Sequence, residues 1–277
     1  MKSHKLTAKD FQIIRLALAE DLGSQGDITS RKLISSTKKG EAVIVARERG
    51  IFCGEKVIHE IIRVGKFKIT PRFYIRDGDK FLSGKKIILI KGDVRDILAA
   101  ERTILNFAGH LSGVSTITAQ FVAMLKNYQV KILDTRKTMP GLRGFEKYAV
   151  RVGGGFNHRM GLWDEVFVKE NHRVYGDLNK LRVSPGKFVI EVRNQRELEA
   201  ALQLKPRVIL LDNYKPNKLS KAVRFAREIN RNVLLEASGG INLSNIRRYA
   251  ATGVDQISIG ALTHSVKSID FSLLMRP

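Results

Sequence analysis

Two apolar runs in the second half of the chain, Phe188-Val-Ile190 before Glu191 and Val208-Ile-Leu-Leu211 before Asp212, show the pattern that decides the fold. The same pattern, an apolar run that ends at polar or glycine residues, recurs at 130–133, 166–168, 233–235 and 256–259. The steps from Glu191 to Asp212, Glu236 and Gly260 are 21, 24 and 24 residues. Such a step holds a strand, a helix of about ten residues and two short loops. The chain therefore repeats a βα unit.

The segments between the runs have helical spacing. Asn194 can cap a helix with Glu197 three residues later. Residues 244–252 predict another helix, which ends at Gly253. A further helical face is formed by Leu219, Ala222, Val223 and Ala226. Alternating strands and helices predict a parallel α/β barrel, complete or incomplete, with a doubly wound open sheet as the competing arrangement. In both, residues after the strand ends meet on one ligand-binding rim.

The first hundred residues predict a separate α+β module. It has an opening helix at 11–22 and strands at 41–47, 68–74 and 86–91. A helix at 94–107 is expected to join this module to the barrel, and the tail after Lys267 is expected to pack back onto it. The predicted domains are residues 1–106 with 266–277, and residues 107–265.

The composition is that of a folded protein with a large positive charge. The chain has 277 residues, 43% of them hydrophobic, and a formal net charge of +22. Charge of this size attracts anions but does not select one, and the basic residues run through the whole chain instead of forming one patch. Cys53 is the only cysteine, so no intrachain disulfide can form, and a reducing cytoplasm is the expected location. No signal peptide or membrane span is predicted.

Basic residues gather at two predicted strand exits and in a glycine-rich segment between them. Arg136 and Lys137 follow the first run of the barrel, His158 and Arg159 follow the glycines of 153–155, and Lys169 ends the next run. One such exit would be ordinary solvated surface. Several cations beside one pocket repel each other, and a multiply charged anion relieves that repulsion. A dicarboxylate or a pyrophosphate fits this description.

Acidic and glycine-rich exits complete the predicted rim. Glu191 and Asp212 end successive strands, which suits Mg²⁺ held mostly through water and substrate oxygens, although the two acids could instead neutralise neighbouring cations. The segments Ser238-Gly239-Gly240 and Gly260-Ala261 resemble loops that hold a phosphate with backbone N–H groups. His110, His172 and His264 lack metal-ligand spacing and are assigned to structure.

Ordered motifs along nearly the whole chain resemble the quinolinate phosphoribosyltransferase family. They are Glu20-Asp-Leu-Gly23, Gly26-Asp-Ile-Thr29, Glu101-Arg-Thr-Ile-Leu-Asn106, Leu133-Asp-Thr-Arg-Lys-Thr138, Pro140-Gly-Leu-Arg143, Gly153 to Arg159, Lys169-Glu-Asn-His172, Leu211-Asp-Asn213 and Ser238-Gly-Gly240. The resemblance implies an N-terminal α/β sandwich domain followed by an open seven-stranded α/β barrel. It also implies that quinolinate and phosphoribosyl pyrophosphate give nicotinate mononucleotide, pyrophosphate and carbon dioxide in NAD biosynthesis.

The resemblance assigns roles to the rim residues. Quinolinate would be bound by Arg136, His158, Arg159 and Lys169, with Arg102 supplied by the neighbouring subunit of a homodimer or larger oligomer. Phosphoribosyl pyrophosphate would be bound by Lys137, Glu191, Asp212, Ser238, Gly239, Gly240, Gly260 and Ala261. Catalysis is assigned to Arg102, Lys137, Glu191 and Asp212, with Mg²⁺ at the two acids.

Two other readings compete with this one. A homologue of the same fold that is linked to molybdenum transport would act on another ring acid. A basic nucleic-acid-binding protein without enzymatic activity would account for the net charge, but no recognition motif supports it.

Overall fold

The computed structural model describes residues 6–276 and divides the chain into two compact units. One unit contains Gln120–Lys137 and Gly155–His264 and is called the barrel unit below. The other contains residues 6–119, Thr138–Gly154 and residues 265–276 and is called the N-terminal unit. The predicted domain boundaries at residues 106 and 265 stay a prediction. No helix in the described part of the chain is long and apolar enough to cross a bilayer.

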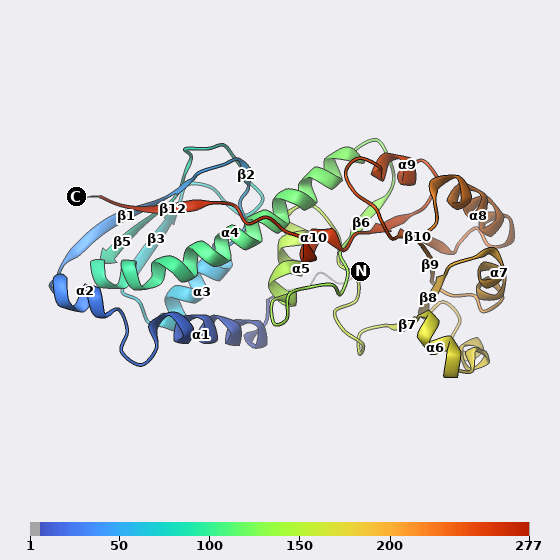
Figure 1. Cartoon of the computed structure of the whole chain (residues 1–277), viewed down its shortest axis with the longest axis horizontal. Helices are drawn as coiled ribbons and strands as arrows, with labels where there is room; N and C mark the ends of the chain where they lie inside the picture. Colours follow the sequence, from blue (N-terminus) through green and yellow to red (C-terminus); the bar gives the residue numbers. More distant parts are fainter. Residues whose placement is uncertain (1–5, 277) are drawn as a thin grey trace. The chain divides into compact units, whose positions relative to one another are not determined.

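The N-terminal unit is built on an antiparallel sheet of four strands in the order β12-β1-β5-β3. Its strands are β1 (Lys39–Ala46), β3 (Ile69–Phe73), β5 (Lys86–Asp93) and β12 (Phe271–Arg276), and a small second sheet pairs β2 (Gly50–Ile51) with β4 (Lys80–Phe81). Figure 1 shows helices backing the larger sheet. The helices of this unit are α1 (Ala8–Leu22), α2 (Ile28–Leu33), α3 (Glu55–Gly65), α4 (Val94–Met124) as far as Ala119, and α5 (Arg143–Val152). The pairing of β12 with β1 confirms that the tail packs onto the first module.

Helix α4 is much longer than the predicted helix at 94–107. Gly109 and Gly113 interrupt the helical pattern in the sequence, yet both lie inside the helix. A Cβ added at Gly109 would lie 2.7 Å from the carbonyl oxygen of Ile269, and one at Gly113 would lie 2.4 Å from that of Lys267. The two glycines therefore allow the segment before β12 to pass against the helix, and the prediction that the helix ends before them was wrong.

The barrel unit is built on a parallel sheet of six strands in the order β6-β11-β10-β9-β8-β7. Its strands are β6 (Lys131–Leu133), β7 (Val166–Val168), β8 (Phe188–Val192), β9 (Val208–Asp212), β10 (Leu234–Ser238) and β11 (Gln256–Ser258). Its helical segments are α6 (Glu170–Tyr175), the 3₁₀ helix η1 (Leu178–Val183), α7 (Gln195–Gln203), α8 (Pro216–Ile229), α9 (Ile246–Ala250) and α10 (Ala261–His264). The predicted α/β class, with an N-terminal domain and a parallel sheet, is confirmed.

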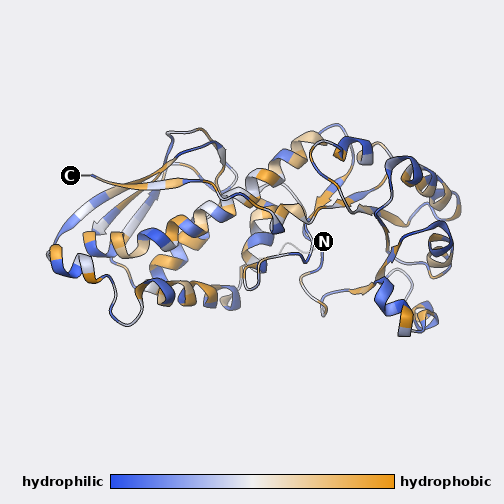
Figure 2. Ribbon diagram, in the orientation of Figure 1, coloured by the Kyte–Doolittle hydropathy of each residue, from blue (hydrophilic) through white to orange (hydrophobic). Residues whose placement is uncertain are grey.

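Helices α7 and α8 cover the outer side of this sheet (Figure 1), and Figure 2 shows them largely hydrophilic where they face away from it. The predicted apolar face of α8 is buried. Asn194 caps α7 as predicted, because its Oδ1 accepts a hydrogen bond of 3.0 Å from the Glu197 N–H. All five residues of β8 are buried, which explains the apolar run Phe188–Ile190 before Glu191.

A seventh strand position lies beside β6. Phe156 forms an isolated parallel bridge with Leu133. Its N–H donates to the Ile132 carbonyl at 2.8 Å, and its own carbonyl accepts from the Asp134 N–H at 3.1 Å. Phe156 therefore extends the sheet beyond β6 by one residue.

Candidate active site

Register brings the carboxyl ends of the parallel strands to one edge of the sheet. Ser238 pairs with Asp212 on one side and with Ser258 on the other, and Ser258 also pairs with Leu133. The residues that follow these strand ends therefore lie side by side, as the alternating pattern predicted. The candidate site is built from this rim of the barrel unit.

Asp134 is an anchor for one part of the rim. It is fully buried and accepts hydrogen bonds from Asn157 Nδ2 at 2.6 Å and from the His158 N–H at 2.9 Å. These two bonds tie the end of β6 to the segment that carries His158 and Arg159. A charged acceptor with two such donors holds the loop more firmly than neutral partners would.

Three of the predicted basic residues surround the ring of Phe167 on β7. The His158 ring stacks on it with a centroid distance of 5.4 Å and an interplanar angle of 13°. The guanidinium carbon of Arg159 lies 4.8 Å from the ring centroid, and Lys169 Nζ lies 5.3 Å from it. The quadrupole of an aromatic face attracts such cations. Phe167 thus holds three basic side chains in one place.

Positive charges repel each other in this cluster around Phe167. Burial lowers the pKa of the Arg159 guanidinium, and the nearby positive charge of Arg136 lowers it further. The Arg159 side chain is held by a hydrogen bond of 2.9 Å from its Nη1 to the Glu165 carbonyl. Arg136 is half-buried beside it. A bound anion would relieve the repulsion between the two guanidinium groups.

A buried carboxylate, Glu236 on β10, lies under this cluster. Its side chain is 1% exposed, and its Oε1 lies 3.6 Å from His158 Nε2. Because His158 Nδ1 accepts the Arg159 N–H at 2.8 Å, the proton of the neutral ring is on Nε2 and faces Glu236. Burial raises the pKa of Glu236 to about 7.

The acid pair, Glu191 and Asp212, ends the neighbouring strands β8 and β9. Burial raises the pKa of Glu191, Lys169 opposes that rise, and the nearby charge of Asp212 adds to it. Lys169 Nζ lies 3.5 Å from Glu191 Oε2. Among residues 6–276, no three His, Cys, Asp or Glu side chains are grouped so as to hold a metal ion. The two carboxylates fit a hard cation only if water and substrate oxygens complete its shell.

The glycine loop, Ser238-Gly239-Gly240, follows β10 and has unusual backbone geometry. Gly239 and Gly240 have φ angles of +96° and +62°. A Cβ added at Gly239 would lie 2.1 Å from Asn213 Oδ1, whereas one at Gly240 would have no atom within 4 Å. Asn213 itself has φ +58° and donates its N–H to the Ser238 carbonyl at 2.8 Å. The loop leaves open space over its backbone, which suits the close approach of a phosphate.

Lys137 lies over the Gly260-Ala261 turn. A Cβ added at Gly260 would lie 3.1 Å from Lys137 Cδ, so the glycine makes room for the lysine stem. The Thr263 hydroxyl donates to the Lys137 carbonyl at 2.6 Å, which fixes the Lys137 backbone against α10. Arg102 lies on α4, in the N-terminal unit, and is exposed.

Comparison with family models decides the family. The model of the quinolinate phosphoribosyl transferase C-terminal domain matches residues 114–274, and the model of the N-terminal domain matches residues 27–112. The chain belongs to the quinolinate phosphoribosyltransferase family. The molybdenum-linked reading of the sequence is not favoured by these matches.

Family members with known names and structures are similar over almost their whole length. The chain is 40% identical over 272 residues to the nicotinate-nucleotide pyrophosphorylase [carboxylating] of Mycobacterium leprae, covering 94% of this chain and 95% of the relative. It is 39% identical over 262 residues to the probable enzyme of that name in Bacillus subtilis, covering 92% and 89%. The solved structure of the nicotinate-nucleotide pyrophosphorylase from Francisella tularensis matches with a TM-score of 0.90 at 39% identity, covering 100% and 99%.

Two residues at the quinolinate phosphoribosyltransferase rim, Phe167 and Arg193, were not predicted from the sequence. Glu236 was expected at a strand end, but its position under the basic cluster was not predicted. Side chains two apart on a strand point to the same face, so Phe167 could have been paired with Lys169, and Arg193 with Glu191. His172, which was assigned to structure, accepts the Lys169 N–H on Nδ1 at 3.0 Å and so orients the start of α6.

Proposed function

We propose that the chain transfers the phosphoribosyl group of phosphoribosyl pyrophosphate to quinolinate and releases pyrophosphate and carbon dioxide, yielding nicotinate mononucleotide for NAD biosynthesis. This proposal rests mainly on the rim, which has two chemically distinct halves. A basic cluster gathers around Phe167, and an acid pair lies beside a glycine loop. The family membership and the names of the relatives support the same reaction.

The basic half suits a dicarboxylate. Arg136, His158, Arg159 and Lys169 are proposed to bind the two carboxylates of quinolinate, and Arg102 of a second copy is proposed to complete this half. Arginine grips a carboxylate with two parallel donors, and lysine adds a compact charge. Quinolinate held in this way presents its ring nitrogen in a fixed direction, which removes much of the entropic cost of the attack.

The other half suits the phosphoribosyl donor. Ser238, Gly239, Gly240, Gly260 and Ala261 are proposed to surround its 5′-phosphate through backbone N–H groups. Lys137 is proposed to lie between the donor and quinolinate, where its charge stabilises the departing pyrophosphate.

The acid pair would share a magnesium ion with the phosphoribosyl donor. Glu191 and Asp212 would hold it together with donor oxygens and water, as the small number of protein ligands requires. Bound there, the ion supplies positive charge that neutralises the pyrophosphate oxygens.

The reaction then needs no general base. As the bond from the anomeric carbon to pyrophosphate breaks, the quinolinate nitrogen forms the new bond to that carbon from the opposite face. The nitrogen becomes positively charged, and its charge stabilises the electron pair that stays on the adjacent ring carbon when the carboxylate there leaves as carbon dioxide. A proton takes its place on the ring.

We further propose a homodimer or larger homo-oligomer that works in the cytoplasm. The exposed position of Arg102 supports its use by another copy. The single cysteine, Cys53, is buried and free, which suits a reducing compartment.

A product assay tests the function. Purified protein with quinolinate, phosphoribosyl pyrophosphate and Mg²⁺ is expected to release pyrophosphate and carbon dioxide in equal amounts. Nicotinate, which lacks one carboxylate, is expected to bind more weakly by about 1.5–3 kcal/mol, one charge-assisted contact. Equal affinity for the two acids would contradict the dicarboxylate assignment. Specific DNA binding without pyrophosphate release would favour the nucleic-acid reading instead.

A further inference from the structure

Arg193, just beyond β8, contacts three carboxylates at once. Its Nε lies 3.4 Å from Asp212 Oδ2, its Nη2 lies 3.7 Å from Glu191 Oε1, and its Nη1 forms an ion pair with Glu170 Oε2. The family assignment gave this arginine no role. Its position across the acid pair is where a metal ion would bind.

The remaining contacts of the acid pair leave little for a free metal ion to use. The second oxygen of Glu191 faces Lys169 Nζ at 3.5 Å. Oδ2 of Asp212, the oxygen near Arg193, also accepts a hydrogen bond of 2.8 Å from Asn213 Nδ2. The chain's own cations therefore already neutralise both acids. A second cation at the same oxygens would be repelled by the guanidinium at short range.

Arg193 also has an alternative partner. Its side chain is 45% exposed, and Glu170, the outermost of its three acids, is 50% exposed. If the guanidinium leaves Asp212 and Glu191, it can keep its contact with Glu170. Such a shift requires a ligand that binds the open arrangement more tightly than the closed one.

We propose that Arg193 is a resident counter-cation that blocks the acid pair against free divalent ions and yields it to a metal ion that arrives with the phosphoribosyl donor. The pyrophosphate brings negative charge of its own, so the metal–donor complex is repelled less by the arginine than the bare ion is. This inference rests on the metal assignment of the proposed function, and it makes Arg193 a residue that sets the order of binding.

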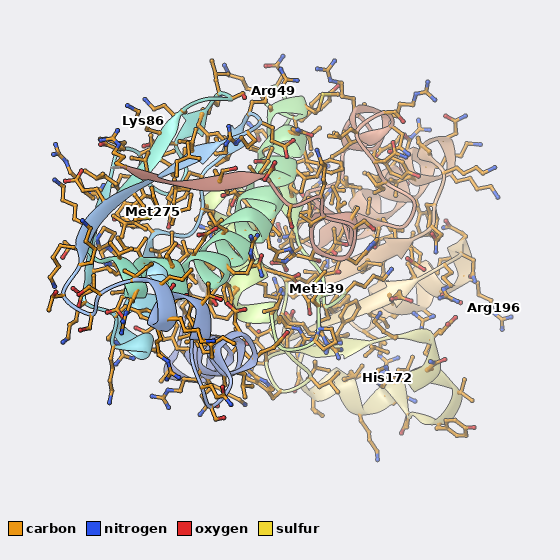
Figure 3. All side chains as sticks on the ribbon, turned by 60° about the vertical axis from the view of Figure 1, so that its left-hand side comes forward. Arg49, Lys86, Met139, His172, Arg196 and Met275 are labelled. Atoms are coloured by element: carbon orange, nitrogen blue, oxygen red, sulfur yellow. The ribbon has the colours of Figure 1, made fainter. Side chains whose placement is uncertain are left out.

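Mn²⁺ titration without donor tests the proposal, with binding measured by calorimetry and by the electron paramagnetic resonance signal of the free ion. Arg193→Gln is expected to bind Mn²⁺ at least tenfold more tightly than the wild type, and Arg193→Lys is expected to fall between them. Arg196→Gln is the matched control, because it removes the same charge from an exposed side chain three residues away, which Figure 3 shows pointing away from the ribbon. It is expected to match the wild type.

A second variant assigns the ion to the acid pair. Glu191→Gln in the Arg193→Gln background is expected to abolish the added Mn²⁺ affinity. Equal affinity in Arg193→Gln and wild type, or retention of the gain in the double variant, would overturn the proposal. Pyrophosphate release by the wild type reports separately on the proposed function, so the inference can fail while the function stands.

Discussion

The guanidinium of Arg159 lies over the ring of Phe167, with 4.8 Å between the guanidinium carbon and the ring centroid. Lys169 Nζ shares the same ring at 5.3 Å. We therefore expect Phe167→Leu to raise the KM for quinolinate by about 3- to 10-fold, since each cation–π contact is worth on the order of 0.5–1 kcal/mol. The kcat is expected to stay within about twofold. Phe167→Tyr keeps the ring and should keep the wild-type KM in the same initial-rate assay. An equal rise in both variants would show that the ring itself is not the cause.

Lys137 can lose its charge without losing its packing. Lys137→Met keeps the stem that lies over Gly260. If the ammonium stabilises the departing pyrophosphate, kcat should fall by about 100-fold or more, as for other groups that act on developing charge. Thermal unfolding should be unchanged within the error of the melt. Wild-type turnover in this variant would refute the role of Lys137.

Neighbouring glycines of the glycine loop should respond differently to alanine. In Gly239→Ala the new methyl would meet Asn213 Oδ1 at 2.1 Å, so Asn213 and the loop must shift. In Gly240→Ala the methyl meets open space and only the left-handed backbone is disfavoured, which costs about 1–2 kcal/mol. Both should lose stability in urea unfolding. Gly239→Ala should in addition raise the KM for phosphoribosyl pyrophosphate at least tenfold, and a larger rise in Gly240→Ala would contradict the clash argument.

Glu236 should make stability depend on pH. Burial raises its pKa from the ordinary 4.5 to about 7. Between pH 4.5 and 7 the Glu236 carboxyl is therefore protonated in the folded state and ionised in the unfolded state. The stability that this proton supports is complete below pH 4.5 and is lost as pH rises through 7. Glu236→Gln removes the titration. Its free energy of unfolding should exceed that of the wild type by up to about 3 kcal/mol at pH 8.

Urea unfolding of both proteins at pH 4.5, 6 and 8 measures this difference. The gap between variant and wild type should be smallest at the lowest pH and should open as pH rises. A gap that stays constant across the series would mean that folding does not shift the pKa of Glu236.

Much of the barrel unit could be predicted because its central strands are buried on both faces. The runs Phe188–Ile190 and Val208–Leu211 are buried along their whole length, so their apolar pattern and the polar residues that follow them are read directly from the sequence. The helix predicted at 244–252 is only Ile246–Ala250. Asn242 Oδ1 accepts hydrogen bonds from the N–H and hydroxyl of Ser244, and this local turn delays the helix.

The contacts that organise the site could not be predicted in the same way. Phe167 meets Arg159, and Glu236 faces His158, only because the sheet brings side chains from non-adjacent strands together. Spacing along the sequence shows which side chains share one face of a strand, but it does not show how the sheet curves and which strands it brings face to face. The residues of the rim could therefore be named from the sequence, but the pairs that hold them could not.

Strand β12, late in the sequence, belongs to the same sheet as the early strand β1. Val43 pairs with Leu274 and Ala46 with Phe271, so β1 lies between β5 and a strand that is synthesised more than two hundred residues later. While the ribosome is still making the barrel unit, β1 has an unpaired edge, which is open to other chains. The N-terminal unit, although it is made first, can reach its final form only after the barrel unit has been synthesised.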